Sequence, residues 1–259
     1  MIEIKELSFA YRHKNVLNNI SLNIENGTLN MLLGLNGAGK TTFFKCLLKL
    51  EKLTNGDIVI DGVSIKDLSA SSLAKRVSFV AQINDIVFTD VYVRDYIVES
   101  RTPYLKNIST PNKDDYLLVE KYAKKVGIDN LLNRELTTLS GGELQLVLIT
   151  RALVQETPII VMDEPTSSLD LVNQAKILET IKLLHEEGKT VIISTHNPNH
   201  ALLLNANVIL LHDNILVEYG RATTVLSEAN IKKVYGDIVK LTSDNSDNKS
   251  FQINITKDF

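Results

Sequence analysis

The chain has 259 residues, of which 44% are hydrophobic, so it is long enough to bury a sizeable core. A formal net charge of −3 and a pI of about 6.0 provide no global basic field, which argues against a nucleic-acid partner. The single cysteine excludes an internal disulfide, the N-terminus has no signal core, and no apolar run reaches the roughly 18 residues of a membrane span, so we expect a soluble, cytoplasmic chain.

Short strands dominate the first third of the chain. Apolar and polar residues alternate over residues 2–4 and 20–24, which is the period of a half-buried antiparallel strand. Asn55-Gly56 and Asp61-Gly62 are turn dipeptides that flank the apolar run Ile58–Ile60. This region therefore predicts an antiparallel β subdomain.

An apolar strand over Met31–Leu33 precedes a glycine-rich segment and a helix. Phe43, Leu47 and Leu50 have helical spacing, which predicts a helix over Thr42–Leu50. Cys46 lies in the same apolar stretch, and we expect it to be a buried structural residue.

The block from about residue 87 to 155 has helical patterning. Residues 116–126 predict one helix, and the polar segment Lys106–Asp115, which contains Pro111, predicts a surface linker. The block is expected to be a helical insertion between two parts of the core.

After this block, strands again alternate with a helix. Strands are predicted over Ile159–Met162 and Thr190–Ser194, with a helix over Asn173–Leu184 between them, so the core sheet is expected to contain parallel strands. Residues 242–249 are polar and predicted to be loose, and the alternation of residues 251, 253 and 255 predicts a terminal strand.

The segment Gly34–Thr41 matches the pattern G-x-x-x-x-G-K-T. Its glycines let backbone N–H groups turn inward around phosphate oxygens, and the following helix points its positive end at them. Lys40 would add charge at the β- and γ-phosphates, and Thr41 would offer its hydroxyl to Mg²⁺. A glycine-rich turn is the alternative, but the strand before the loop and the helix after it favour nucleotide binding.

Two carboxylates, Asp163 and Glu164, follow the apolar run Ile159–Met162. Ligands of open α/β sheets bind at this edge of the strands. Asp163 would hold Mg²⁺ directly or through water, and Glu164 is placed to polarise a water molecule for attack on the γ-phosphate. In isolation such acids often only cap the next turn, and the phosphate loop is what favours the functional interpretation.

The segment Ser140-Gly141-Gly142-Glu143 has two compatible interpretations. Ser-x-x-Glu is a capping box at the start of a helix. Two glycines at a helix start also expose backbone N–H groups, which form an anion site. Because the chain already has one phosphate loop, we expect this second site to serve the nucleotide of a partner copy.

Four single residues fit the same chemistry. Gln82 and His196 follow predicted strands, Tyr11 follows the first strand and is suited to stack on adenine, and Asp170 lies just beyond the carboxylate pair. Taken one at a time each is more often structural. The strand-end positions of Gln82 and His196 favour a role in the site.

At these residues the chain resembles the ATP-binding subunits of ABC transporters over about residues 1 to 240. Gly34 to Thr42 resembles the Walker A loop, Ile159 to Glu164 the Walker B strand, and Leu139 to Glu143 the signature motif. Further single positions resemble the A-loop aromatic, the Q-loop, the D-loop and the switch histidine, namely Tyr11, Gln82, Ser168-Leu169-Asp170 and His196.

This resemblance implies an α/β fold: a P-loop NTPase core with a mixed sheet, an N-terminal antiparallel β subdomain and an inserted α-helical subdomain. It implies a cassette over 1–240, with the insertion at about 87–155, and a tail over 241–259 with a possible edge strand. It also implies catalytic roles for Glu164, His196 and Gln82. The residues implied to bind the nucleotide are Tyr11, Asn36, Gly37, Ala38, Gly39, Lys40, Thr41, Thr42, Ser140, Gly141, Gly142 and Asp170.

The family further implies ATP hydrolysis with Mg²⁺ held by Thr41, Gln82 and Asp163. Two cassettes would bind head to tail, each ATP lying between the phosphate loop of one copy and the signature motif of the other. The homodimer would act at the cytoplasmic face of the membrane on permease subunits, and indirectly with a substrate-binding protein, without a nucleic-acid partner.

Local motifs resemble the subgroup that imports iron-siderophore, haem and cobalamin. They are Val93-Arg94-Asp95, Arg101 to Tyr104, Leu171 to Gln174 and Thr195 to Asn199. Related importers carry molybdate or tungstate, and a soluble, non-transport ABC ATPase is a second alternative. A small-molecule kinase would leave the signature motif without a purpose.

Overall fold

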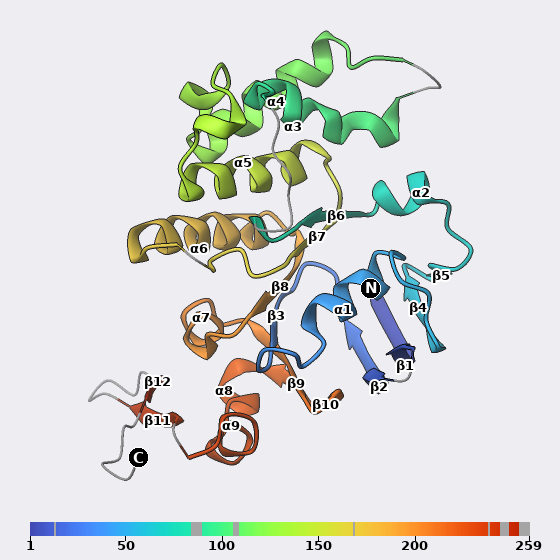
Figure 1. Cartoon of the computed structure of the whole chain (residues 1–259), viewed down its shortest axis with the longest axis vertical. Helices are drawn as coiled ribbons and strands as arrows, with labels where there is room; N and C mark the ends of the chain where they lie inside the picture. Colours follow the sequence, from blue (N-terminus) through green and yellow to red (C-terminus); the bar gives the residue numbers. More distant parts are fainter. Residues whose placement is uncertain are drawn as a thin grey trace. The chain divides into compact units, whose positions relative to one another are not determined.

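The computed structural model describes residues 1–12, 14–83, 90–105, 109–167, 169–237, 239–243 and 249–253. The chain folds into two compact units, one made of Met1–Asp67 and Ile192–Phe259 and the other of Leu68–Val191 (Figure 1). Ser168, Ile255, residues 87–89 and residues 106–108, to which some of the predictions above refer, lie outside the described residues.

An antiparallel sheet forms the N-terminal part of the first unit. Its strand order is β2–β1–β4–β5, with bounds β1 (Ile2–Tyr11), β2 (Lys14–Ile24), β4 (Asn55–Ile60) and β5 (Val63–Ser64). Ile2 pairs with Ile24 on one side and with Ile60 on the other, and all three side chains are buried. The alternating pattern therefore predicted the sheet and its buried face correctly.

One of the two predicted turn dipeptides belongs to a strand. Asp61-Gly62 makes the turn between β4 and β5, as predicted, but Asn55-Gly56 lies inside β4. A Cβ on Gly56 would lie 2.3 Å from the carbonyl oxygen of Lys5, and φ of Gly56 is +85°. The β1–β4 register shifts beside it, so this glycine marks an irregularity in the strand pair.

A second sheet of the first unit carries the phosphate-loop strand. Its strands occur in the order β10–β9–β3–β8, with bounds β3 (Leu29–Leu33), β8 (Thr190–Thr195), β9 (Asn207–His212) and β10 (Ile215–Arg221). β3 runs parallel to β9, β10 runs antiparallel to β9, and every residue of β3 is buried. The mixed sheet and the antiparallel sheet confirm the predicted fold class.

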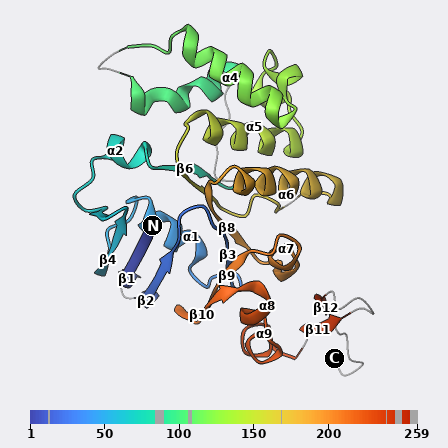
Figure 2. The same cartoon turned by 180° about the vertical axis from the view of Figure 1, so that it is seen from behind.

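The helix after β3 is shorter than predicted at its C-terminal end. α1 spans Lys40–Leu47, Lys49 adopts a positive φ of 57°, and Leu50 is 64% exposed. The helical spacing of Leu50 is therefore coincidental. The other helices described in this unit are α7 (Pro198–Leu203), α8 (Ala222–Val225) and α9 (Glu228–Tyr235) (Figure 2).

The C-terminal segment of the first unit forms a hairpin. β11 (Val239–Ser243) pairs antiparallel with β12 (Lys249–Ile253), and Phe251 is buried. β12 contains Phe251 and Ile253 of the predicted terminal strand, and β11 is its partner. That strand contains Thr242 and Ser243, which were predicted to be loose.

The second unit contains a parallel strand pair and a group of helices. β6 (Val77–Val80) pairs in parallel with β7 (Ile159–Met162). Its helical elements are α2 (Ala70–Ala74), α3 (Val93–Val98), η2 (Glu99–Tyr104), α4 (Lys113–Val126), η3 (Asp129–Leu131), η4 (Leu136–Thr138), α5 (Gly141–Val154) and α6 (Leu171–Glu186). α3, α4 and α5 share one apolar core, which includes Ile97, Val119 and Val147.

The exact bounds predicted for the insertion and the tail stay predictions.

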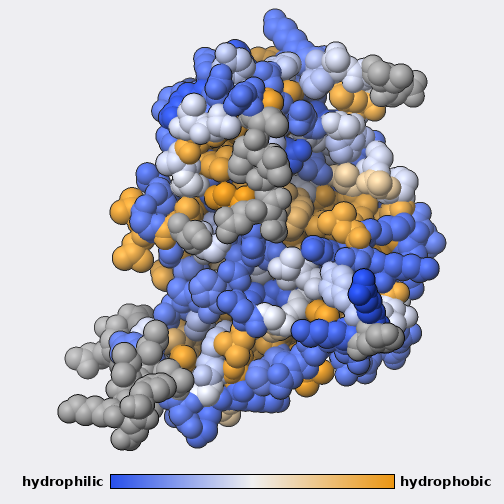
Figure 3. Space-filling model, viewed as in Figure 1, coloured by the Kyte–Doolittle hydropathy of each residue, from blue (hydrophilic) through white to orange (hydrophobic). Residues whose placement is uncertain are grey.

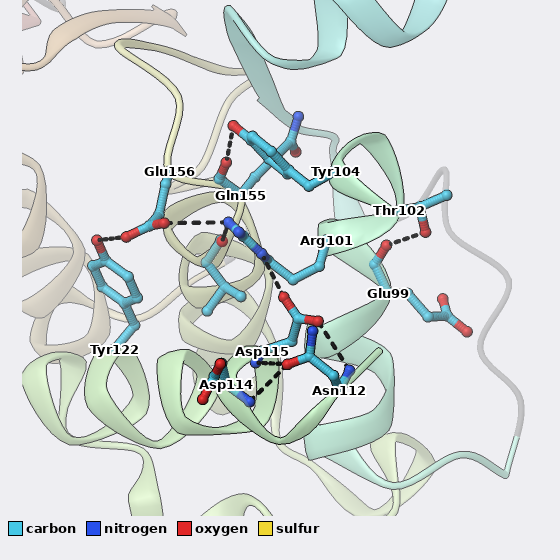
Figure 4. A network of polar contacts seen from close by, with 11 residues as sticks. Glu99, Arg101, Thr102, Tyr104, Asn112, Asp114, Asp115, Tyr122, Gln155 and Glu156 are labelled. Atoms are coloured by element: carbon cyan, nitrogen blue, oxygen red, sulfur yellow. Dashed lines mark hydrogen bonds and ion pairs between the residues drawn. The ribbon is translucent and has the colours of Figure 1, made fainter. Parts of the chain in front are cut away.

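The start of α4 corrects the predicted linker. Asn112 accepts hydrogen bonds from the backbone of Asp114 and Asp115, and the Asp115 carboxylate accepts one from the backbone of Asn112. This capping box begins the helix at Lys113, so residues 113–115 are helical. The same Asp115 accepts a hydrogen bond from Arg101, which connects α4 to η2 (Figure 4).

Hydrophilic residues cover most of the face drawn in Figure 3. Within the described part of the chain, no helix has the length and hydrophobicity needed to cross a bilayer. Two large apolar side chains at the start of α6, Leu171 and Val172, are 82% and 67% exposed.

Candidate functional site

The phosphate loop connects β3 to α1 within the first unit. The N-cap of α1 is Gly39, with a φ of 94°, and no side chain caps this helix end. A Cβ on Gly39 would lie 2.7 Å from the carbonyl oxygen of Val16, and one on Gly34 would lie 2.6 Å from that of Leu211. Only glycine fits at these two positions, so the loop lies closely against its neighbours at the start of α1.

The ammonium group of Lys40 lies across this loop. Its Nζ donates to the carbonyl oxygens of Gly34 at 2.9 Å and Leu35 at 3.3 Å, and the residue is 6% exposed. Asn36 and Gly37 are exposed at the loop tip, and Ala38 and Thr42 are buried. A buried cation beside the N-terminus of a helix provides the chemistry that binds phosphate oxygens.

A pocket of about 330 Å³ lies beside the loop tip. It is lined by loop residues and by the turn between β9 and β10, namely Leu35, Asn36, Gly37, Ala38, His212, Asp213 and Asn214. The turn is fastened to β2, because the backbone N–H of Asn18 donates to the carbonyl oxygen of Asn214 at 2.8 Å. The β9–β10 turn that lines this pocket is therefore hydrogen-bonded to the antiparallel sheet of the same unit.

Tyr11 and His196 also belong to the first unit. The Tyr11 ring is 41% exposed and packs edge-on against Phe9, with ring centroids 4.7 Å apart. Its hydroxyl donates to Glu51 at 3.0 Å, and burial, together with this hydrogen bond, raises the pKa of Tyr11. His196 is exposed directly after β8. Stacking of Tyr11 on adenine remains a prediction.

Asp163 and Glu164 follow β7 in the second unit. Asp163 is 1% exposed, and its backbone N–H donates to Val80 of β6 at 2.9 Å. Glu164 is half-buried and has a positive φ of 45°, which is uncommon for a residue with a Cβ. Gln82 follows β6, and because β6 and β7 run parallel with Val80 opposite Met162, Gln82 lies at the same sheet edge as the two acids.

The signature motif forms the start of α5. Ser140 Oγ accepts a hydrogen bond from the backbone N–H of Glu143, and the Glu143 carboxylate accepts one from the backbone N–H of Ser140 at 2.9 Å. The Ser140 backbone and side-chain hydrogen bonds, with Arg134 nearby, lower the pKa of Glu143. The predicted capping box is confirmed, and Ser140 and Gly141 remain exposed at the helix start.

The signature motif contacts the start of α6 in the same unit. A Cβ on Gly142 would lie 2.6 Å from Cγ of Asn173, and Asn173 donates to Asp170 through its backbone N–H at 2.9 Å and its Nδ2 at 2.7 Å. These hydrogen bonds lower the pKa of Asp170. Asn173 connects Gly142 with Asp170, and the sequence analysis did not select it as a site residue, because an asparagine in the first turn of a helix is common.

In the first unit, the glycine cradle, the buried Lys40 and the start of α1 suit the phosphates of a nucleotide. Thr41 of the same unit offers a hydroxyl oxygen, and Gln82 and Asp163 of the second unit offer amide and carboxylate oxygens, which are ligand types that Mg²⁺ prefers. That these three residues hold one Mg²⁺ ion stays a prediction.

Known proteins were found that are similar to this chain in sequence. The ABC transporter family matches residues 17–167 of the chain. An uncharacterized ABC transporter ATP-binding protein of Haemophilus influenzae is 39% identical over 235 residues, which cover 91% of this chain and 89% of the relative. The petrobactin import ATP-binding protein of Bacillus anthracis is 31% identical over 237 residues, which cover 91% and 87%.

Two solved structures share the fold. A metal-chelate type ABC transporter in an inward-facing conformation matches with a TM-score of 0.85 and 25% identity, covering 98% of this chain and 97% of the other. The dimeric structure of a bacterial ABC transporter cassette matches with a TM-score of 0.76 and 28% identity, covering 86% and 99%. The chain therefore belongs to the ABC transporter family, as an ATP-binding cassette with ATPase activity.

Proposed function

We propose that this chain is the ATP-hydrolysing subunit of an importer for an iron-siderophore, haem or cobalamin type substrate. The similarity to a petrobactin import protein and to a metal-chelate type transporter supports this substrate class. The cassette would work at the cytoplasmic face of the membrane on permease subunits, which receive the substrate from a binding protein.

Two unlike half-sites on one chain support a head-to-tail homodimer. The observation that carries this proposal is the signature helix. α5 has 14 residues, exposes Ser140 and Gly141 at its positive end, and belongs to a different unit from the phosphate loop. A helix start of this kind suits the γ-phosphate of a nucleotide held by a second copy. The similarity to a dimeric cassette supports the same arrangement.

In the proposed reaction a water molecule attacks the γ-phosphorus and ADP leaves. Glu164 would accept the proton of the water, and Lys40 would stabilise negative charge on the phosphate oxygens. His196 would hydrogen-bond near the γ-phosphate. When bound by Thr41, Gln82 and Asp163, Mg²⁺ supplies further charge stabilisation at the phosphates.

Glu164→Gln tests the dimer. Loss of the base with retention of the binding groups should trap an ATP-bound dimer, so size-exclusion chromatography with ATP should give a doubled mass. Glu179→Gln, on an exposed position of α6, is the matched control and should hydrolyse ATP normally. A monomeric Glu164→Gln protein would contradict the proposed dimer.

Ser140→Arg tests which nucleotide the signature helix serves. A bulky cation at the start of α5 should block hydrolysis and leave ATP binding by the isolated cassette intact. Loss of ATP binding by the monomer would instead assign the motif to the chain's own pocket.

The transport role is tested by purifying the complex from detergent-solubilised membranes. Permease subunits should copurify, and the partner binding protein should contain iron or cobalt by metal analysis, with the absorption spectrum of a chelate. Recovery of ribosomal or nucleic-acid partners without a permease would contradict a transport function, and a molybdenum- or tungsten-loaded binding protein would contradict the substrate class.

A further inference from the structure

The residues on either side of His196 are tied to each other. Thr195 is the last residue of β8, and its Oγ1 accepts a hydrogen bond at 3.1 Å from the backbone N–H of Asn197. This bond closes a tight turn with His196 at its centre. The backbone of His196 is therefore bracketed by two residues that are hydrogen-bonded to each other.

The ring of His200 contacts both ends of this turn. His200 is 7% exposed, with its Nδ1 3.4 Å from Thr195 Oγ1 and its Nε2 3.2 Å from Asn197 Nδ2. Both of these ring nitrogen contacts are to immediate neighbours of His196. The ring therefore connects the end of β8 with Asn197, the N-cap of α7, across the position of His196.

The hydrogen-bond donors and acceptors define one tautomer of His200. Asn197 Oδ1 accepts from the backbone N–H of Asn199 at 3.0 Å, so the amide of Asn197 directs its NH₂ group at His200. Nε2 of His200 must then accept, and Nδ1–H donates to Thr195 Oγ1. Burial, with a smaller contribution from the proximity of His196, lowers the pKa of His200, which keeps the ring neutral as this arrangement requires.

We propose that His200 is a positioning residue for ATP hydrolysis, which clamps Thr195 and Asn197 so that His196 is presented to the γ-phosphate in one orientation. The inference rests on the role of His196 proposed above. His200 itself contacts neither nucleotide nor water in this scheme and acts through the backbone of its neighbour. Because hydrolysis depends on the placement of reacting groups to within a fraction of an ångström, loosening this turn should lower the rate of the chemical step.

The chain offers a matched control on the same helix. The side chain of Asn199 accepts from the backbone N–H of Phe251 at 2.7 Å and donates to its carbonyl oxygen at 3.1 Å, which fastens α7 to β12. Asn199→Ala therefore perturbs α7 and its packing while leaving the contacts of His200 in place.

The test compares His200→Phe, His200→Gln, Asn199→Ala and His196→Ala by steady-state ATPase kinetics, ATP binding and thermal unfolding. His200→Phe retains a ring of similar size without its nitrogens, and we expect kcat to fall about tenfold or more with KM and ATP affinity nearly unchanged. His200→Gln, whose amide is able to accept from Asn197, should recover part of the rate. Asn199→Ala should keep the normal kcat.

Proton–nitrogen correlation NMR of the unsubstituted protein gives an independent readout. The proposal requires a neutral His200 ring protonated on Nδ1, so this measurement is able to overturn the proposal even if His200→Phe does not fold. Protonation on Nε2, a normal kcat in folded His200→Phe, a loss confined to ATP affinity, or an equal loss in Asn199→Ala would each overturn it. If His196→Ala turned over normally, the proposed role of His196 would fail instead.

Discussion

Arg101 neutralises a buried carboxylate, and its removal should strongly destabilise the second unit. Only 11% of the Arg101 side chain and 9% of the Asp115 side chain are exposed, with Nε 3.1 Å from Oδ1. The guanidinium also donates to the carbonyl oxygen of Val154 at 3.0 Å and stacks over the Tyr104 ring at 4.2 Å (Figure 4). Arg101→Met retains most of the apolar stem but leaves Asp115 buried without its counter-charge.

The magnitude follows from burial. Removing one partner of a buried ion pair costs about 3–5 kcal/mol, whereas an exposed pair contributes about 0–1 kcal/mol. For a protein of this size, 1 kcal/mol shifts the Tm by about 2–4 °C, so Arg101→Met should lower the Tm by about 6–20 °C. The control is Lys182→Met, because Lys182 and Glu186 form a pair at 3.9 Å with side chains 65% and 58% exposed.

Scanning calorimetry of both variants, and of Arg101→Met combined with Asp115→Asn, completes the measurement. The double variant should recover part of the lost stability, because a buried carboxamide is easier to accommodate than an unpaired carboxylate. If Arg101→Met lowers the Tm no more than Lys182→Met does, or if Asp115→Asn restores none of the lost Tm, the Arg101–Asp115 pair does not contribute the stability expected of a buried ion pair.

Three further outcomes are expected. Glu143→Ala breaks the capping box and should lower the free energy of unfolding by about 1 kcal/mol near neutral pH. Folding lowers the pKa of Glu143, so its carboxylate stabilises the protein above the ordinary carboxyl pKa. The stability difference between Glu143→Ala and the unsubstituted protein should therefore disappear as the pH falls through the lowered pKa. Cys46 is buried with its pKa raised to about 12, so it should react with a thiol reagent only after unfolding in denaturant. Gly142→Ala places a Cβ 2.6 Å from Asn173 and should lower the Tm, and adding Asn173→Ala should restore part of the loss.

The sequence predicts an element correctly where the pattern of residues is compatible with only one kind of secondary structure. The four apolar residues 159–162 form β7 with the bounds predicted, since a short buried run before two acids has few alternatives. The predictions at Gly56 and Leu50 failed for a shared reason. Each residue fits a local rule, but its conformation depends on a neighbouring strand or on a left-handed residue that local pattern does not reveal.

In the candidate site too, local sequence pattern identifies some residues, whereas others depend on contacts that only the structure shows. Motif residues such as Lys40 and Ser140 are identifiable because their chemistry requires a fixed spacing along the chain. His200 and Asn173 were not selected, because their importance lies in which atoms they contact. Each lies within five residues of a motif position, at His196 or Asp170, and each is hydrogen-bonded to the segment that carries it. A search for polar side chains about one helical turn after each motif would therefore have found His200 and Asn173 in the sequence.

The positive φ of Glu164 allows a substitution that should remove ATP hydrolysis without lowering the stability of the protein. A φ of 45° costs a residue with a Cβ about 1–2 kcal/mol, while glycine loses about 0.5–1 kcal/mol more chain entropy on folding. Glu164→Gly should therefore leave the Tm unchanged or raise it, and the hydrogen bonds from Ser167 to the Glu164 carbonyl oxygen would be retained. Glu179→Gly, in the exposed middle of α6, should instead lose about 1 kcal/mol.

If Glu164 is the base, Glu164→Gly should hydrolyse almost no ATP at a normal or raised Tm, and Glu179→Gly should hydrolyse ATP normally at a lowered Tm. Equal destabilisation by the two substitutions would contradict the strain argument, and a stable Glu164→Gly protein with normal turnover would contradict the role of the carboxylate. A stable but inactive Glu164→Gly protein would support the proposal that the reaction needs a carboxylate at this position.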